Sequence, residues 1–462
     1  MQQHGLCGLA LTAQAEKLRT RKVSALELLD AHLERIERRN RALGAAVSVE
    51  AEAARAAARA ADIALERGTL LGPLHGIPVL LKDCHEVAGL RSTIGTRELD
   101  HVADSDGAVA ARVRAAGGIV FGHTNAAAWL ADLQTSNPIF GRTNNPWDPT
   151  RTAGGSSGGA AAAVAACLTP FDVGSDLMGS TRLPASFCGV YGLKTTEHRV
   201  PLTGFFRTPG DGPRPVRILT SLGPVARDLA DLALVLGVIS GPDGLDGDVP
   251  PVPLPRPSPR RASELRLAIA STIGGSPVAA SIRQRVSRVA ADAKKAGAHV
   301  VTRLPALDWA DLGALLTDLV ETLTSTFAPG ADKDDPRRTL AWYLEALGRR
   351  DRFVSVWERY FDDLDALIVP ATMTTAFGHC EQGGEVAVDG RPVSYYENSR
   401  LLGPSNLVGA PTLTVPAGLD DDGLPIGLQL IGPRWSEMRL IDVARALEDA
   451  KVLPGLRRPP GD

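Results

Sequence analysis

The glycine- and serine-rich segment 154–159 combines residue types and spacing that could do chemistry. It reads GGSSGG and runs directly into the alanine-rich stretch 160–166. A glycine-rich loop that opens a helix presents backbone N–H groups and the positive end of the helix dipole, which suits an anion or a developing oxyanion. The segment therefore predicts an anion-stabilising loop, and a flexible linker is the alternative interpretation.

Two known motifs can be compared with this segment. A phosphate-binding P-loop needs a Lys after its last glycine, and none follows here. Gly154, Ser156 and Gly158 satisfy the GxSxG pattern of a nucleophile elbow, but an elbow needs a strand leading into it. The preceding residues 144–152, NNPWDPTRT, indicate a proline-broken polar loop instead. We therefore expect neither nucleotide binding nor an elbow.

Lys82 is a second residue that could do chemistry. It follows the apolar run 77–81, IPVLL, which is typical of a buried strand, and Asp83 comes directly after it. Because burial disfavours the charged form of an amine, such a lysine is either paired with a carboxylate, for example Asp83, or kept as a base. A further small-residue segment that could hold a reactive group is 174–185, GSDLMGSTRLPA.

Short apolar runs that alternate with helical stretches must position these segments. Helices are expected near the N-terminus, one with a capping box from Ser24 to Glu27 and one over 50–65 that ends at Gly68. The expected buried strands are 77–81, 119–121, 265–269, 300–301, 367–369, 413–415 and 427–431. The expected helices between them are 108–116, 160–167, 228–238 and 282–296. The alternation predicts an α/β protein.

Composition is that of an ordinary globular chain. The 462 residues are 44% apolar and 22% charged, which supplies enough apolar material for a large core. The net charge is -3 with no long run of one sign, so we expect no direct binding to nucleic acid or to an acidic membrane surface.

Cysteine usage and the N-terminal sequence bear on location. Five cysteines without a CxxC pair favour reduced thiols and give no indication of structural zinc. No apolar run approaches the length that spans a bilayer, and no Lys or Arg precedes the apolar stretch 6–12, as a signal peptide would require. We therefore expect a cytoplasmic protein.

Three long motifs match a known family. Segments 72–83 (GPLHGIPVLLKD), 141–159 (GRTNNPWDPTRTAGGSSGG) and 174–194 (GSDLMGSTRLPASFCGVYGLK) resemble, in order and spacing, the motifs of the amidase signature family. The similarity continues to the C-terminal helix and is weakest over 250–363. The resemblance implies an α/β fold with a single domain, in which helices cover both faces of a mixed, twisted β-sheet core.

The resemblance also implies how the chain is organised. One amidase domain is expected over residues 1–462, and the Pro-rich run VPPVPLPRPSP within it is interpreted as an excursion rather than a linker between two domains. The expected parts are an N-terminal helical arm (8–66), a catalytic core (70–245), the Pro-rich excursion (249–261), a variable helical region (305–363) and the completion of the core (364–450).

Catalytic roles follow from the resemblance by matching position. Ser180 matches the nucleophile of a Ser-cisSer-Lys triad, Ser156 matches the bridging serine in a cis peptide, and Lys82 matches the base. The matching oxyanion hole consists of the backbone N–H groups of Leu177, Met178, Gly179 and Ser180.

The neighbouring residues receive supporting roles. Ser157, Asp176 and Arg182 are expected to hold the two loops by hydrogen bonds. The candidates for substrate contact are Trp129, Phe205 and Phe206. The histidines lack helical ligand spacing, so we assign no metal site, and we interpret His75, His85 and His123 as structural.

The chemistry of a lysine base sets a condition on the site. A serine hydroxyl attacks only once a base takes its proton, and a lysine can take it only when it is neutral. The site must therefore lower the lysine pKa from about 10.4 by desolvation and by the absence of a paired carboxylate. Lys82 must consequently point away from Asp83.

Some positions depart from the pattern of the family. Met178 stands where the family usually has Gly, so the loop would be strained if this position requires a positive φ. With an ordinary φ, Met178 would only fill part of the acyl pocket. Cys84, Ala153 and Thr195 also replace the family's usual residues, but none of these changes removes a catalytic group.

The sequence thus predicts a serine amidohydrolase without a cofactor. Ser180 would be acylated by a small-molecule amide, and water would then release a carboxylate after ammonia or an amine has left. Three alternatives stay open: an A-type subunit of a glutamine amidotransferase whose ammonia serves a partner acting on charged tRNA, an acyltransferase or esterase with this fold, and a non-catalytic member. A homodimer is a candidate assembly.

Overall fold

A mixed sheet of eight strands runs through the centre of the protein. We describe it from a computed structural model in which residues 4–206, 216–325 and 335–460 are described. The strand order is β12-β11-β13-β17-β16-β9-β10-β8, and only the pairs β11/β12 and β11/β13 are parallel. Its strands are β8 (Phe171–Asp176), β9 (Tyr191–Lys194), β10 (Ser221–Ala226), β11 (Arg266–Ile269), β12 (His299–Val301), β13 (Ala366–Pro370), β16 (Thr412–Leu419) and β17 (Pro425–Ile431).

A second sheet of three strands lies beside the edge strand β8. It has the order β1-β5-β2, and its strands are β1 (Ala46–Val47), β2 (Pro78–Lys82) and β5 (Ile119–Thr124). Side chains bridge the two sheets, because the N–H of Leu80 donates to Thr169 Oγ1 at 3.1 Å and Thr124 Oγ1 donates to Asp172 Oδ2 at 2.7 Å. The remaining strands form three small ribbons: β3 (Arg91–Ser92) with β4 (His101–Val102), β6 (Ser136–Asn137) with β7 (Gly141–Arg142), and β14 (Glu385–Val388) with β15 (Arg391–Ser394).

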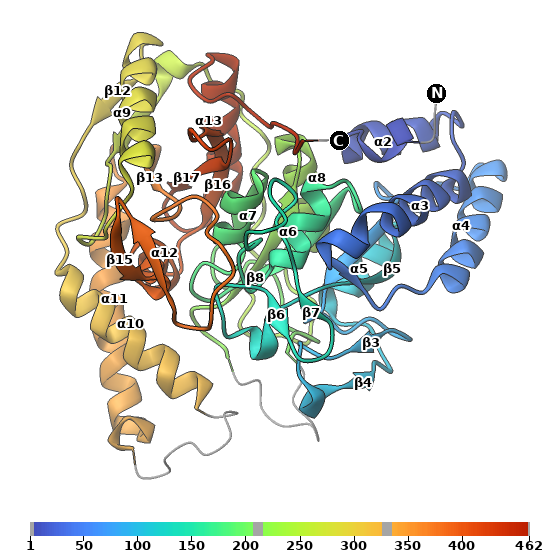
Figure 1. Ribbon diagram of the computed structural model, residues 1–462, viewed down its shortest axis with the longest axis horizontal. Coiled ribbons are helices and arrows are strands. Elements are labelled where there is room, and N and C mark those ends of the chain that lie inside the picture. Colours follow the sequence, from blue (N-terminus) through green and yellow to red (C-terminus); the bar gives the residue numbers. More distant parts are fainter. Residues whose placement is uncertain (1–3, 207–215, 326–334, 461–462) are drawn as a thin grey trace.

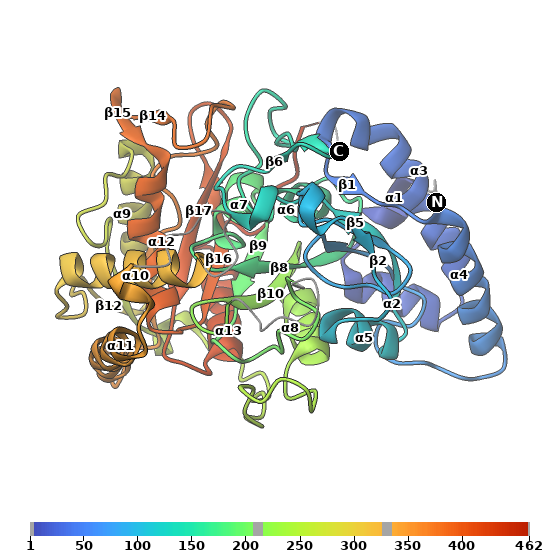
Figure 2. The same cartoon turned by 90° about the horizontal axis from the view of Figure 1, so that it is seen from below.

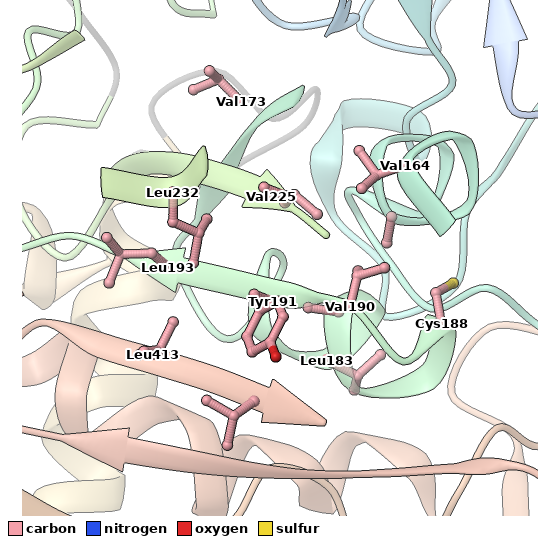
Figure 3. Close-up of a cluster of buried hydrophobic side chains, with 14 of the residues drawn as sticks. Val164, Val173, Leu183, Cys188, Val190, Tyr191, Leu193, Val225, Leu232 and Leu413 are labelled. Carbon is pink, nitrogen blue, oxygen red and sulfur yellow. The ribbon is translucent and has the colours of Figure 1, made fainter. Parts of the chain in front are cut away.

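Helices cover both faces of the large sheet. Figure 2 shows α6 (Gly158–Ala165) and α7 (Arg182–Cys188) on one side of the central strands, and α8 (Leu229–Ile239) and α13 (Glu437–Asp449) on the other. Figure 3 shows the core that results, where Val164 of α6, Leu183 of α7 and Leu193 of β9 belong to one cluster of buried side chains. The α/β architecture with helices on both faces of a mixed sheet is thereby confirmed.

The other helices lie at the two ends of the molecule. In Figure 1 the N-terminal helices lie beside the three-stranded sheet, and α9 to α11 lie at the opposite end. The first group is α1 (His4–Cys7), α2 (Leu11–Arg19), α3 (Ala25–Leu43), α4 (Ala51–Glu66) and α5 (Ala108–Ala115), and the second is α9 (Ala280–Lys295), α10 (Trp309–Thr324), α11 (Leu340–Tyr360) and α12 (Ser399–Leu407). The capping box that begins α3 is present as predicted, with Ser24 and Glu27 bonded reciprocally.

The seven predicted strands all form, and their bounds differ from the prediction by a few residues at most. Three strands of the large sheet, β8, β9 and β10, were not predicted. Their sequences FDVGSD, YGLK and SLGPVA are rich in residues that strands disfavour, and β10 contains Pro224 opposite Val173. Tertiary packing on both faces therefore outweighs their weak local preference.

The Pro-rich run packs along the body of the protein. Ser258 donates its N–H to Asp442 Oδ2 of α13 at 2.7 Å, and the carbonyl of Val252 accepts a hydrogen bond from Arg199. The strands that follow the run, β11 and β12, join the same large sheet. Residues 207–215 of the expected catalytic core and 326–334 of the expected variable region lie outside the described residues. None of the helices in the described ranges is both long and apolar enough to cross a membrane.

Candidate active site

Lys82, the last residue of β2, brings its side chain into a cluster of serines. Its Nζ donates to Ser156 Oγ at 2.8 Å, to Ser157 Oγ at 2.8 Å and to Ser175 Oγ at 2.9 Å. The side chain is fully buried. Within the described part of the chain, all hydrogen-bond partners of its amino group are hydroxyls. This arrangement solvates the amine without placing a counter-ion on it.

Asp83 points away from this cluster. Its carboxylate accepts a hydrogen bond from the N–H of Thr93 at 2.9 Å and others from the hydroxyls of Thr93 and Ser92. Lys82 and Asp83, both among the described residues, therefore do not form the ion pair considered above. Burial lowers the pKa of Lys82 to about 8, although Cys84, Asp172 and Asp176 act in the opposite direction.

The segment that precedes α6 holds Ser156 in place. The peptide bond between Gly155 and Ser156 is cis. A side chain on Gly155 would lie 2.5 Å from the carbonyl of Gln134, so only glycine fits there. Thr135 fastens the segment, because its hydroxyl donates to the carbonyl of Gly154 at 2.8 Å and accepts from the N–H of Gly158 at 2.9 Å. The segment thus forms neither an elbow nor a loose linker.

Ser180 lies in the turn between β8 and α7, next to this segment. The N–H of Ser157 donates to the carbonyl of Ser180 at 3.0 Å, which ties the two loops together. Ser156, Ser175 and Ser180 line one cavity. The hydroxyl of Ser180 makes no hydrogen bond to any residue within the described ranges. The structure therefore places Ser180 beside the Lys82 cluster, with its hydroxyl not yet bonded to Ser156.

Backbone N–H groups in the same turn differ in what they bind. The N–H of Gly179 donates to Asp176 Oδ1 at 2.8 Å, so it already has an acceptor. In the residue ranges described above, the N–H groups of Leu177, Met178 and Ser180 have no protein acceptor. Three of the four N–H groups expected to form an oxyanion hole are thus available, whereas that of Gly179 is used to shape the turn.

The departure at Met178 does not strain the turn. The backbone of Met178 lies outside the left-handed region, and Gly179 adopts the positive φ of 104°. A side chain on Gly179 would lie 2.3 Å from Leu402 Cδ1, so glycine is needed at this position for space as well as for φ. The side chain of Met178 lines the cavity, which is the outcome expected for an ordinary φ.

Asp176 and Arg182 form a fully buried ion pair with an N–O distance of 2.9 Å beneath the turn. Burial alone would raise the pKa of Asp176, but the Arg182 guanidinium, together with Lys194 and the Gly179 N–H, holds it well below its usual range. Arg182 also donates to the carbonyl of Leu402 at 2.8 Å and to Asn406 Oδ1 at 2.6 Å, both on α12. The pair therefore joins the turn to α12.

The cavity has a volume of about 640 Å³. The three aromatic residues expected to contact substrate, Trp129, Phe205 and Phe206, line it. Ser175 also lines it and was missed by sequence reasoning, although a serine inside the small-residue segment 174–185 was a signal that could have identified it. Residues of α10 and the start of α12 also line the cavity: Thr317, Val320, Glu321, Thr324 and Ser399.

The histidines take structural positions. His85 Nε2 bonds the carbonyl of Val173 at 2.8 Å, and His123 Nδ1 bonds that of Leu81 at 3.0 Å. Burial lowers the pKa of His85 to about 3, so its imidazole is neutral. In the described part of the chain, no group of three or more His, Cys, Asp or Glu residues is placed to hold a metal ion.

Comparison of the sequence with known proteins points in one direction. The profile of the family described as Amidase matches residues 27–321 and 316–441. The A subunit of glutamyl-tRNA(Gln) amidotransferase from Moorella thermoacetica is 33% identical over 94% of this chain and 95% of its own length. The protein of the same name from Streptomyces coelicolor is 32% identical over 95% of each chain.

Solved structures with the same architecture include one from an amidotransferase and several from hydrolases. A bacterial aryl acylamidase of the amidase signature family superposes with a TM-score of 0.82 at 25% identity, covering 96% of this chain and 97% of its own. A 6-aminohexanoate cyclic dimer hydrolase gives 0.80 at 27% identity, covering 98% and 99%. The A subunit of glutamyl-tRNA(Gln) amidotransferase from Thermotoga maritima gives 0.79 at 26%, covering 96% and 95%.

Proposed function

The chain belongs to the amidase family, and on this premise we propose that it cleaves the C–N bond of a carboxylic amide through an acyl-enzyme on Ser180. The observation that carries the proposal is the buried Lys82 amine, which is bonded to Ser156 and lacks a counter-ion beside the cavity that holds Ser180. Such an amine is poised to act as a base, because its pKa of about 8 leaves part of it neutral near pH 7 to 8.

The steps can be assigned to named atoms. Neutral Lys82 takes the proton of Ser156, and Ser156 takes the proton of Ser180 once the Ser180 side chain has turned toward it. Ser180 Oγ then bonds the carbonyl carbon, and the free N–H groups of Leu177, Met178 and Ser180 stabilise the oxyanion. Each donor of this kind commonly contributes about 3–4 kcal/mol to transition-state stabilisation.

The second half of the reaction uses the same path in reverse. The proton held by Lys82 returns through Ser156 to the amide nitrogen, the C–N bond breaks, and ammonia or an amine leaves. Water then attacks the Ser180 ester and gives up a proton along the same path. That proton returns to Ser180 Oγ as its bond to the carbonyl carbon breaks and the acid leaves, to ionise as the carboxylate. Neither half needs a cofactor, since every proton and electron pair is supplied by these side chains, the amide and water.

A second candidate is an A-type subunit of a glutamine amidotransferase. The sequence relatives favour it over plain hydrolysis of a small amide, because those that we compared bear the name of the A subunit of glutamyl-tRNA(Gln) amidotransferase. In that case glutamine would be the amide, and its ammonia would be used by partner subunits. The chemistry at Ser180 would be the same, and only the substrate and the fate of the ammonia would differ.

Substitution of the triad tests the proposal. Release of ammonia or amine from a panel of amides, including L-glutamine, should be abolished by Ser180→Ala, nearly abolished by Lys82→Ala and strongly reduced by Ser156→Ala. A serine-directed fluorophosphonate should label the native chain at Ser180 and leave Ser180→Ala unlabelled. Full turnover by folded Ser180→Ala would overturn the assignment. Glutaminase activity that rises on addition of amidotransferase partner subunits would favour the second candidate.

A further inference from the structure

Three aromatic side chains that contact one another form an aromatic wall of the cavity that Ser180 also lines. Trp129 and Phe206 have ring centroids 6.5 Å apart, and Phe205 and Phe206 have ring centroids 6.2 Å apart. Contacts at this separation and tilt are favourable for aromatic pairs, so the three rings support one another. Phe205 and Phe206 are buried and Trp129 is half-buried, which leaves an aromatic surface toward the cavity.

The backbone that carries these aromatic residues adopts an unusual conformation. Trp129, Leu130 and Phe206 have φ values of 56°, 57° and 49°, in the left-handed region that bulky residues rarely adopt. Hydrogen bonds hold them there, from the N–H of Trp129 to the carbonyl of Ile94 at 3.0 Å and from the N–H of Phe206 to the carbonyl of Cys84 at 3.1 Å. Because Cys84 follows Lys82 by two residues, the wall is fixed relative to the base.

Most of the surface that the described lining presents to the cavity is apolar, although many of its residues carry hydroxyl groups. It includes the aliphatic side chains of Leu130, Leu133, Leu177, Met178, Val216 and Val320. A cavity of about 640 Å³ with such a lining has the size and character of a small-molecule site that recognises apolar groups by contact. A bulky apolar group bound there gains burial, whereas a charged group loses hydration.

The charged side chains of the described lining are all acidic. Asp132 and Glu321 are the acidic side chains of the described lining, which contains no Lys, Arg or His. Asp132 accepts hydrogen bonds from the Tyr395 hydroxyl and from the Leu133 N–H, each at 2.7 Å. The guanidinium of Arg337 bonds Glu321 at 2.6 Å but is shared with Asp318 and Asp335. Among the lining residues that the structure describes, a carboxylate on the substrate would therefore meet two carboxylates and no cation.

From this lining we propose that the substrate is an amide without an anionic group, bearing an aryl or similarly bulky apolar substituent, and that free glutamine is a poor substrate. The inference rests on the proposed function of Ser180 and specifies what that serine acts on. The aromatic wall of Trp129, Phe205 and Phe206 binds the apolar substituent, and the two acidic side chains exclude carboxylates.

Matched amides test the substrate class. 4-Phenylbutanamide and the monoamide of glutaric acid share an unbranched acyl chain and differ only in the group at its end, whereas L-glutamine has an ammonium group beside its carboxylate. We expect kcat/KM for 4-phenylbutanamide to exceed that for the two carboxylates by at least about 100-fold, because a carboxylate loses its hydration without gaining a partner. A preference for L-glutamine or the glutaric monoamide would overturn the inference.

A positive charge introduced into the cavity lining provides a second test of the substrate class. Thr317 lies on α10 and lines the cavity, whereas Ala314 is exposed one turn earlier and does not. Thr317→Arg should shift the ratio of kcat/KM values toward the glutaric monoamide by about tenfold or more, as expected when a bound anion gains a nearby cation. Ala314→Arg is the matched control and should leave the ratio unchanged. An equal ratio in the two variants would count against the lining as the source of selectivity.

Labelling of Ser180 distinguishes failure of the substrate inference from failure of the proposed function. If Ser180 reacts with a fluorophosphonate but glutamine is preferred, the substrate class is wrong and the proposed mechanism stands. If Ser180 is not labelled in the folded native chain and no amide is cleaved, the proposed function itself fails. Ala314→Arg should be labelled at the rate of the native chain, since Ala314 belongs neither to the catalytic cluster nor to the cavity lining.

Discussion

The backbone N–H of Lys82 donates to the carboxylate of Asp172 at 2.8 Å, and this hydrogen bond joins the strand that ends in the proposed base to the strand that leads to Ser180. Asp172 is fully buried on β8 and also accepts from the Thr124 hydroxyl and from its own neighbour, the N–H of Val173. Burial raises the pKa of Asp172 to about 7, opposed by these donors. A buried carboxylate therefore sets the distance between the two sheets at the active site.

Removal of this link should impair both folding and catalysis. Asp172→Ala leaves the N–H of Lys82 and the hydroxyl of Thr124 without an acceptor, and each buried unsatisfied group commonly costs about 1–3 kcal/mol. We expect a lower midpoint in urea unfolding and a loss of kcat that exceeds the change in KM. Asp228→Ala, which removes an exposed helix cap, is the control and should affect stability alone. Native kcat in Asp172→Ala would show that the link is dispensable.

The pH dependence of amide cleavage should report Lys82. Because burial lowers its pKa to about 8, the amine is protonated and inactive as a base below this pH and neutral above it. A profile of kcat/KM against pH should therefore rise between about pH 6 and pH 9 with a midpoint near 8. A flat profile over this range would contradict the role of Lys82 as the titrating base.

The same pKa shift should appear in stability. Between about pH 8 and 10.5 the unfolded chain holds a proton on Lys82 that the folded chain has lost, so this residue's contribution to the free energy of unfolding rises with pH. Other groups titrate in this window, so the quantity to measure is the difference between the native chain and Lys82→Met. The free energy of unfolding of the native chain should rise relative to that of Lys82→Met as pH rises through this window. A constant difference between the two would argue against a lowered pKa of Lys82.

The ion pair beneath the nucleophile turn should be costly to break. Arg182→Met leaves Asp176 buried without its cation, and removal of one partner of a buried pair commonly destabilises by about 3–5 kcal/mol. The exposed pair of Arg19 and Glu16 is the matched control, since Arg19→Met should change the free energy of unfolding by less than about 1 kcal/mol. Chemical denaturation of the two variants checks the difference, and equal small effects would mean that the buried pair does not support the turn.

Glycine at position 179 should be indispensable. Gly179→Ala would bring a methyl group against Leu402 and place it on a backbone with φ of 104°, so we expect loss of activity and reduced stability. Leu402→Ala added to Gly179→Ala should not restore stability, because Leu402 Cβ would still lie 2.9 Å from the added methyl group and the positive φ remains. Gly237→Ala, in α8 with open space around it, is the control and should stabilise by about 0.5–1 kcal/mol. Native activity in Gly179→Ala would mean that the turn can rearrange.

Much of the candidate site could be predicted because its residues lie in contiguous motifs. The run that ends at Lys82 is an unbroken apolar strand, and the segment 154–159 is dense in small residues before a helix, so local sequence indicated both. The role of Ser180 came from the resemblance to a family and stays a prediction until it is tested. The α/β fold followed from the alternation of strands and helices, which local periodicity encodes.

Only the tertiary structure decided how these segments meet. Strands β8 to β10 have weak local preference and form because both faces are covered. Strand β8 places Ser175 beside Lys82, from which it is separated by 93 positions in the sequence. Three further features depend on tertiary contacts. Asp83 points away from Lys82, Asp176 accepts the N–H of Gly179, and aromatic and acidic side chains gather around one cavity. The sequence by itself determined which groups are available, whereas long-range packing determined their charge state, their hydrogen-bond partners and the cavity they line, because burial and neighbours set these properties.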